Sequence, residues 1–135
     1  MLFWERPERV ETVLRAYVAR VATGLDLGPE SWFCEFTDVR TAYVALAGRL
    51  PVAPDRDAAL LWDDRHGWSV AIETGSAEDL IVLAWFGPDV LPAPDDVVAF
   101  VQRLLRGRPA GQPRPPTPPS DPVVPAGHLD DVDAV

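Results

Sequence analysis

The sequence predicts an α+β domain in two layers, with an N-terminal helix, an antiparallel meander sheet of about five strands and a C-terminal helix. Three observations support this fold class. Apolar residues recur at helical spacing over residues 10–21 and again over residues 97–105. Between these segments lie short runs typical of strands, separated by glycine, proline and aspartate. Short links between consecutive strands favour antiparallel pairing, which makes the sheet a meander.

The composition is that of one folded domain with an acidic surface. The chain has 135 residues, 47% of them hydrophobic, which is enough for one hydrophobic core. Its net charge of −9 argues against binding to nucleic acid phosphates or to an anionic membrane, and is more compatible with a basic partner. The chain contains no lysine, which excludes a catalytic lysine Schiff base and a phosphate-loop lysine.

Cysteine usage and the N-terminal segment indicate the cellular location of the protein. Cys34 is the sole cysteine, so neither an internal disulfide nor a cysteine-based zinc site can form. The first residues, MLFWERPERVE, become charged too early for a signal peptide, and no apolar run approaches the length needed to cross a membrane. We therefore expect a cytoplasmic protein.

Composition changes sharply after Arg106, which divides the chain into two parts. Residues 107–135 contain eight prolines and cannot bury enough apolar area to offset the entropy of ordering. We predict one globular domain over residues 1–106 and a flexible proline-rich tail over residues 107–135. The stretch PRPPTPP either docks on an aromatic groove of a partner or belongs to a solubilising tail.

The first element is an amphipathic helix. Pro7 suits its first turn and Gly24 suits the position just past its end. Its apolar stripe recurs at steps of three and four residues: Val10, Val13, Leu14, Tyr17, Val18 and Val21.

Strands follow this helix. In the run 31–37, Trp32, Cys34 and Phe36 alternate onto one side. The run 41–48 fits either a strand or a helix, and a strand is preferred because the run is short and Gly48 and Pro51 follow closely. Three further strands are predicted over residues 58–62, 68–73 and 80–86.

The last element is a helix that begins at Pro94. Asp95 and Asp96 lie near its positive end, and Gly107 ends it. Its apolar stripe consists of Val97, Val98, Val101, Leu104 and Leu105. Together with the first helix, it must bury this stripe on the sheet.

The stretch ALLWDDRHGWSVAIE, residues 59–73, raises the question of an active site. We interpret Asp64, Arg65, His66 and Gly67 as a type I turn with a glycine in the left-handed conformation, which joins two strands through a three-residue loop. Asp64 then supplies a side-chain bond to the turn backbone. The polar cluster therefore needs no catalytic explanation.

The same turn predicts the register of the hairpin. It places three pairs opposite each other on the core face: Asp64 with Trp68, Trp62 with Val70, and Leu60 with Ile72. Leu61 and Ala71 then lie on the other face of the sheet.

Two catalytic alternatives compete with this interpretation. Asp55, Asp57, Asp63, Asp64 and His66 could gather around magnesium or manganese, but carboxylates at a hairpin tip usually point to water. Ser69, within GWSVA, falls inside a strand rather than at the sharp strand-to-helix turn of a nucleophile elbow. We expect no catalytic residue, no bound metal and no cofactor.

The strand 80–86 is apolar on both faces and carries the functional hypothesis. Leu80, Val82, Ala84 and Phe86 alternate with Ile81, Leu83 and Trp85, so both faces need a cover. If the two helices share one face, an apolar patch remains, and such a patch marks an interface.

Three hypotheses follow in order of preference. The first is a non-catalytic protein-interaction or regulatory accessory module that acts with a protein partner or as a homodimer. The second is a small-ligand binder with a tryptophan-lined cleft. The third is a metal-dependent enzyme at the cluster of residues 55–66. The residues expected to bind the partner or ligand are Trp62, Trp68, Leu83 and Trp85.

The stretch ALLWDDRHGWSVAIE, with AYVAL before it and VLPAP before the last helix, resembles a family of small actinobacterial proteins of unknown function. The resemblance covers residues 10–105, and the LLWDxRHGW hairpin is its most specific part. The absence of lysine suits such a source. The resemblance implies a shared hairpin and assigns no activity, ligand or catalytic residue.

Overall fold

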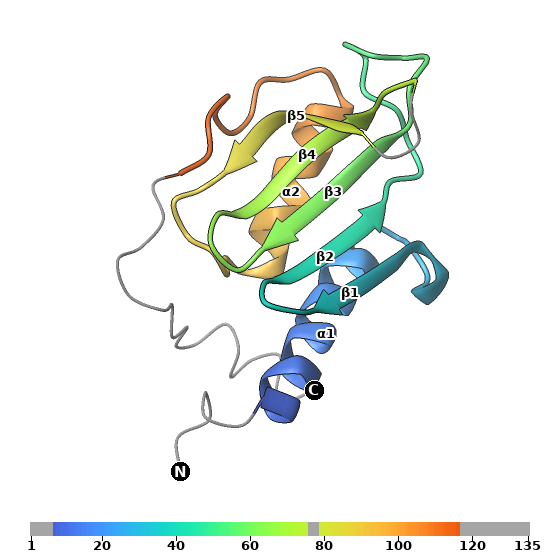
Figure 1. The fold of residues 1–135 in the computed structure, drawn as a ribbon. Helices are drawn as coiled ribbons and strands as arrows, with labels where there is room; N and C mark the ends of the chain where they lie inside the picture. Colours follow the sequence, from blue (N-terminus) through green and yellow to red (C-terminus); the bar gives the residue numbers. More distant parts are fainter. Residues whose placement is uncertain (1–6, 76–78, 117–135) are drawn as a thin grey trace.

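The computed structural model describes residues 7–75 and 79–116. Figure 1 shows a sheet with one helix before it and one helix after it in the chain, and the sheet has five strands. The elements follow the order α1 (Pro7–Gly24), a short 3-10 helix η2 (Pro29–Ser31), β1 (Trp32–Phe36), β2 (Arg40–Ala45), β3 (Ala58–Asp63), β4 (Gly67–Glu73), β5 (Leu80–Phe86) and α2 (Pro94–Leu105). All neighbouring strands pair antiparallel in the order β1-β2-β3-β4-β5. The predicted α+β meander is confirmed, including a strand within residues 41–48.

Both helices pack on the same face of the sheet, as Figure 1 shows, and they contact each other. The predicted stripe of α1 is buried in full. In α2 the buried residues are Val97, Phe100 and Val101. Phe100 was missing from the predicted stripe, and its ring stacks on Phe86 of β5 with centroids 4.8 Å apart. The core therefore lies between the sheet and the helix pair.

The end of α1 differs from the prediction, because Gly24 is the last residue of the helix rather than the residue beyond it. Asp26 takes the left-handed position, with φ 64°, and the N–H of Leu27 donates to the carbonyl of Ala22 at 2.9 Å. Gly24 has another role: a Cβ there would lie 2.7 Å from Cγ2 of Val98 in α2. The missing side chain lets the two helices approach each other.

The hairpin between β3 and β4 has the predicted faces but a different register. Trp62 lies opposite Trp68, and Asp63 lies opposite Gly67. The predicted pairing of Asp64 with Trp68 is wrong by two residues, because Asp63 rather than Asp64 bonds the turn backbone. Since side chains alternate with a period of two, a shift of two residues keeps each side chain on its face.

Strand β5 contains a β-bulge that changes which residues face the helices. Val70 pairs with Ala84, but Ala71 pairs with Val82, so Leu83 is the extra residue. The predicted alternation along the whole strand is therefore wrong. Val82 lies on the same face as Trp85, and Leu83 packs partly buried against the core.

The chain beyond α2 continues along the edge of β5. Gly107 follows the end of the helix, as predicted, and takes the left-handed conformation with φ 76°. Gln112 then forms an antiparallel bridge with Trp85, through backbone hydrogen bonds of 2.7 and 2.9 Å. Of the predicted tail, residues 107–116 thus lie against the domain, and residues 117–135 fall outside the described residues. Within the described part of the chain, no helix has the length and apolar character needed to cross a bilayer.

Candidate interaction surface

The sheet face turned away from α1 and α2 carries the candidate site, and we call it the open face. One continuous row of side chains crosses all five strands on this face, because each residue lies opposite the next in the strand register. The row consists of Phe33, Tyr43, Leu61, Ser69 and Trp85. Neither helix covers this row, as the arrangement in Figure 1 shows.

A second row of small residues runs beside the first. Ala45, Ala59, Ala71 and Val82 lie opposite one another in the same way. Tyr43 reaches across this row, because its hydroxyl donates to Oε1 of Glu73 at 3.2 Å. Burial, reinforced by the negative charge of Glu73, raises the pKa of Tyr43, so its hydroxyl stays protonated and available as a donor.

Aromatic rings gather at the two ends of the first row. At the β1 end, Phe33 stacks on Tyr43 with ring centroids 5.4 Å apart, yet Phe33 remains 52% exposed. At the β5 end, the rings of His66 and Trp85 meet in an edge-type arrangement with their centroids 5.6 Å apart. The open face thus presents aromatic groups toward both edges of the sheet, whereas Ser69, Ala59 and Ala71 between them are buried.

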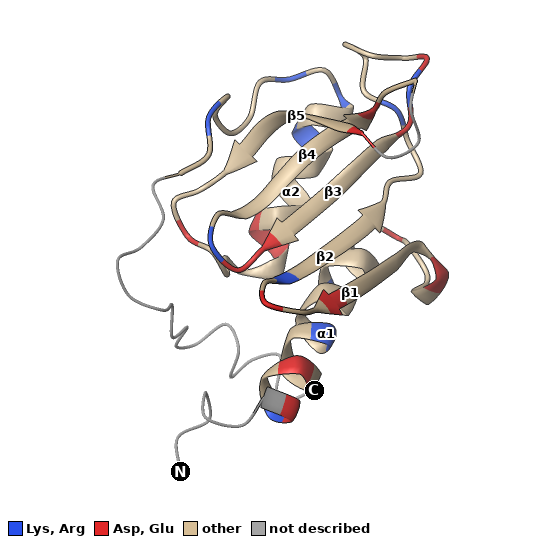
Figure 2. Cartoon of the chain, viewed as in Figure 1, with Lys and Arg blue, Asp and Glu red and all other residues tan. Residues whose placement is uncertain are grey.

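The charged residues that face outward on the strands are all acidic. They are Glu35 on β1, Asp63 on β3 and Glu73 on β4. The one basic residue within the strands, Arg40, belongs to the opposite set of alternating positions. Figure 2 shows the centre of the sheet without charge and the charged residues at the strand ends. The open face is therefore an apolar surface with acidic residues at its border.

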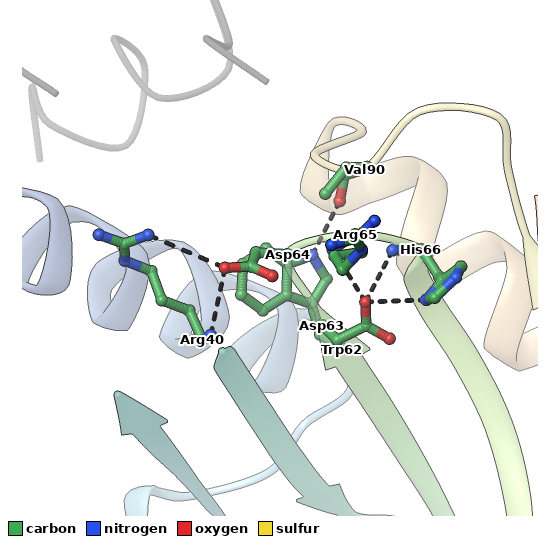
Figure 3. A network of polar contacts seen from close by, with 7 residues as sticks. All are labelled: Arg40, Trp62, Asp63, Asp64, Arg65, His66 and Val90. Carbon is green, nitrogen blue, oxygen red and sulfur yellow. Dashed lines mark hydrogen bonds and ion pairs between the residues drawn. The ribbon is translucent and has the colours of Figure 1, made fainter. Parts of the chain in front are cut away.

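The hairpin tip is organised by two carboxylates, which Figure 3 shows. Oδ1 of Asp63 accepts the backbone N–H groups of Arg65 at 2.8 Å and His66 at 2.7 Å, and lies 3.2 Å from Nδ1 of the same histidine. Oδ2 of Asp64 accepts the backbone N–H of Arg40 at 3.2 Å. These contacts hold the turn and join it to β2, which supports the structural interpretation of the cluster.

Gly67 follows this turn with φ 78°, the left-handed conformation predicted for it. A Cβ at Gly67 would lie 3.0 Å from the backbone oxygen of Asp89. The glycine is therefore required both by the backbone conformation and by the close approach of the segment after β5.

Trp62 and Trp68 lie on the helix-covered face and are buried. Nε1 of Trp68 donates to the hydroxyl of Tyr17 at 3.0 Å, and that hydroxyl donates to the carbonyl of Pro92 at 2.6 Å. Nε1 of Trp62 donates to the carbonyl of Val90 at 2.8 Å. Burial raises the pKa of Tyr17 far above its usual range, which keeps this donor protonated.

The residues expected to bind a ligand are thus divided between the two faces. Trp85 lies on the open face, Leu83 packs against the core, and Trp62 and Trp68 join the sheet to α1 and to the segment before α2. Phe33 and Tyr43 complete the open face and were not singled out from the sequence. The alternation of side chains along each strand does indicate their side, because Phe33 points away from the side of Cys34, and Tyr43 points away from the side of Ala42.

The carboxylates considered for a metal site are not brought together. Asp57 precedes β3 and Asp63 ends it, so the strand places them at opposite ends, about 20 Å apart at ~3.3 Å per residue. Over residues 7–75 and 79–116, no group of three or more potential metal ligands forms. Cys34 is half-buried on the helix side, and burial raises its pKa to about 11, which keeps the thiol protonated.

One protein-family model matches most of the chain. A model described as a family of unknown function, DUF6292, matches residues 17–103. The chain belongs to the DUF6292 family. The DUF6292 match begins inside α1, spans all five strands and ends inside α2. No curated protein and no solved structure shows significant similarity to the chain.

Proposed function

We propose that this protein is a non-catalytic interaction module whose open face binds a protein partner. The partner presents apolar side chains bordered by arginine or lysine. The observation that carries the proposal is the row from Phe33 to Trp85, which neither helix covers and whose charged neighbours on the same face of the strands are all acidic.

The residue types in this row favour protein binding. Tyrosine and tryptophan are enriched among interface residues whose truncation costs about 2 kcal/mol or more. Tyr43 and Trp85 both lie half-exposed, so each has ring surface left to bury. An apolar centre with a charged border is also the usual arrangement of a protein interface.

Electrostatics favours a basic partner. Glu35 is exposed, and Asp63 and Glu73 are half-exposed, so a bound arginine or lysine can reach each carboxylate from solvent. The chain as a whole carries a net charge of −9, which speeds encounter with a basic surface and slows encounter with an acidic one.

Three polar side chains of the open face, Tyr43, Asp63 and Glu73, take part in structural contacts, which supports binding rather than catalysis. Asp63 holds the hairpin turn, and the hydroxyl of Tyr43 is bonded to Glu73. We further propose a cytoplasmic location, and that the LLWDxRHGW hairpin is the element that small actinobacterial relatives share. Trp62 and Trp68 would be retained in such relatives because their indole N–H groups bond to other parts of the core.

Selection of peptides from a displayed random library on the immobilised full chain tests the proposal. Wild type should enrich peptides that combine aromatic or branched apolar residues with arginine or lysine. Leu61→Arg places a cation in the centre of the open face and should abolish their binding. Glu35→Arg should weaken binding by about three- to tenfold, since one rim charge is reversed.

Glu8→Arg is the matched control, because it makes the same change of charge at an exposed position of α1, on the helix side of the sheet. It should leave peptide binding at the wild-type level. Peptides that bind Leu61→Arg as tightly as wild type, or enriched peptides without excess positive charge, would contradict the proposal.

A further inference from the structure

We propose that the free edge of β1 pairs with β1 of a second copy of the chain, so that one antiparallel sheet runs through a symmetric dimer. This inference concerns the backbone edge of the sheet rather than its open face. It therefore does not depend on the function proposed above.

The two edges of the sheet differ in the backbone hydrogen bonds that they form. At β5, the bridge between Trp85 and Gln112 occupies part of the edge with two backbone hydrogen bonds. At β1, the described residues show backbone hydrogen bonds to β2 and to no other strand. An unpaired strand edge presents a row of N–H and C=O groups that can accept another strand.

Strand β1 also lacks several of the features that normally prevent edge pairing. Its sequence, WFCEF, contains no proline and no lysine, and its register with β2 is continuous from Trp32 to Phe36 without a bulge. The one charged side chain is Glu35. Beside it, Phe33 exposes 52% of its surface at this edge, an apolar group that a second strand would cover.

Symmetry restricts the register of such a pair. With a two-fold axis perpendicular to the sheet, the open faces of both copies lie on the same side of the dimer sheet. Since residues directly opposite each other share a face, one residue of β1 must lie opposite the same residue of the second copy, across the axis. Only the register centred on Cys34 pairs all of residues 32–36. It places Phe33 opposite Glu35 of the second copy and Trp32 opposite Phe36 of the second copy. In this register Glu35 does not lie opposite Glu35 of the second copy. The register centred on Glu35 would place these two like charges directly opposite each other.

This arrangement doubles the open face. The two Phe33 side chains lie diagonally across the axis, within about 8 Å of each other, close enough for aromatic contact. The rows of the two copies would then form one surface.

A charge-exchange series on the full chain tests both the edge and its register. Light scattering with size-exclusion chromatography measures the mass, and circular dichroism confirms that each variant is folded. Wild type should be a dimer at micromolar concentration. Phe33→Glu sets two pairs of like charges across the axis and should raise the dimer dissociation constant about tenfold or more. Phe33→Lys should keep the dimer, because each new lysine faces a glutamate.

The decisive variant combines Phe33→Glu with Glu35→Lys, which restores opposite charges across the axis and should recover the dimer. Wild type that stays monomeric at a millimolar concentration would overturn the proposal. So would a folded double variant that remains monomeric. A dimer that survives Phe33→Glu and is split by Leu61→Arg would also overturn it, and would place the contact on the open face instead.

Discussion

Tyr17 of α1 and Trp68 of β4, 51 residues apart in the sequence, are joined in the core by a hydrogen bond of 3.0 Å from the indole N–H to the phenol oxygen. The phenol hydroxyl in turn donates to the carbonyl of Pro92. One buried hydroxyl therefore connects the first helix, the sheet and the segment that leads into the last helix. The ring centroids lie 6.0 Å apart, so the pair is also in packing contact.

Tyr17→Phe should lower the free energy of unfolding by about 1–3 kcal/mol, because it leaves the indole N–H and the Pro92 carbonyl buried without a partner. Urea denaturation measures the change. Tyr43→Phe is the matched control: it removes a hydroxyl that is only partly buried, and should cost less than about 1 kcal/mol. Equal losses of unfolding free energy in the two variants would show that the buried hydrogen bonds of Tyr17 stabilise the fold no more than the partly buried bond of Tyr43.

Stability should fall as the pH rises above about 10. The pKa of Tyr17 in the folded protein is raised by burial, while the unfolded chain has the ordinary value near 10. The folded state therefore retains its proton where the unfolded state releases one, so the stabilising contribution is complete below about pH 10 and is lost as the pH rises. Urea midpoints between pH 8 and 11 should fall less steeply in Tyr17→Phe than in wild type. Parallel curves would contradict the assignment.

Gly67→Ala should cost about 1–2 kcal/mol, since the new side chain must adopt a left-handed backbone conformation and meets the Asp89 carbonyl. Gly75→Ala is the control, because a Cβ at that position has no atom of residues 7–75 or 79–116 within 4 Å. It should change stability by less than about 0.5 kcal/mol. Thermal unfolding measures both variants, and a tolerated Gly67→Ala would contradict the turn geometry.

Truncation should separate two parts of the proline-rich region. A chain ending at Pro116 should keep wild-type stability, on the ground of the composition beyond that residue. A chain ending at Arg106 loses the Trp85–Gln112 bridge and the two bonds from the Arg103 guanidinium to the Pro109 carbonyl. Its free energy of unfolding should fall by about 1–3 kcal/mol. Identical melting temperatures for both truncated chains would show that residues 107–116 contribute nothing.

The candidate surface could be predicted from the sequence only in part. The double-sided apolar character of residues 80–86 predicted an uncovered apolar patch only if both helices share one face of the sheet, and the structure shows both helices on one side. Trp85 was singled out and lies on the open face. Phe33 and Tyr43 were missed, since alternation shows which residues share a side of one strand but not which strands become neighbours. That information depends on register, which brings all five side chains into one row.

The sequence by itself determined the elements, their order and which side of the β3–β4 hairpin enters the core. These features follow from local periodicity and turn chemistry, as the buried stripe of α1 and the left-handed Gly67 show. Tertiary structure alone decided the bulge at Leu83, the two-residue shift of the hairpin and the close approach of Gly24 to Val98. Each depends on contacts between residues distant in the sequence, where small differences in packing and hydrogen bonding select among local conformations of similar energy.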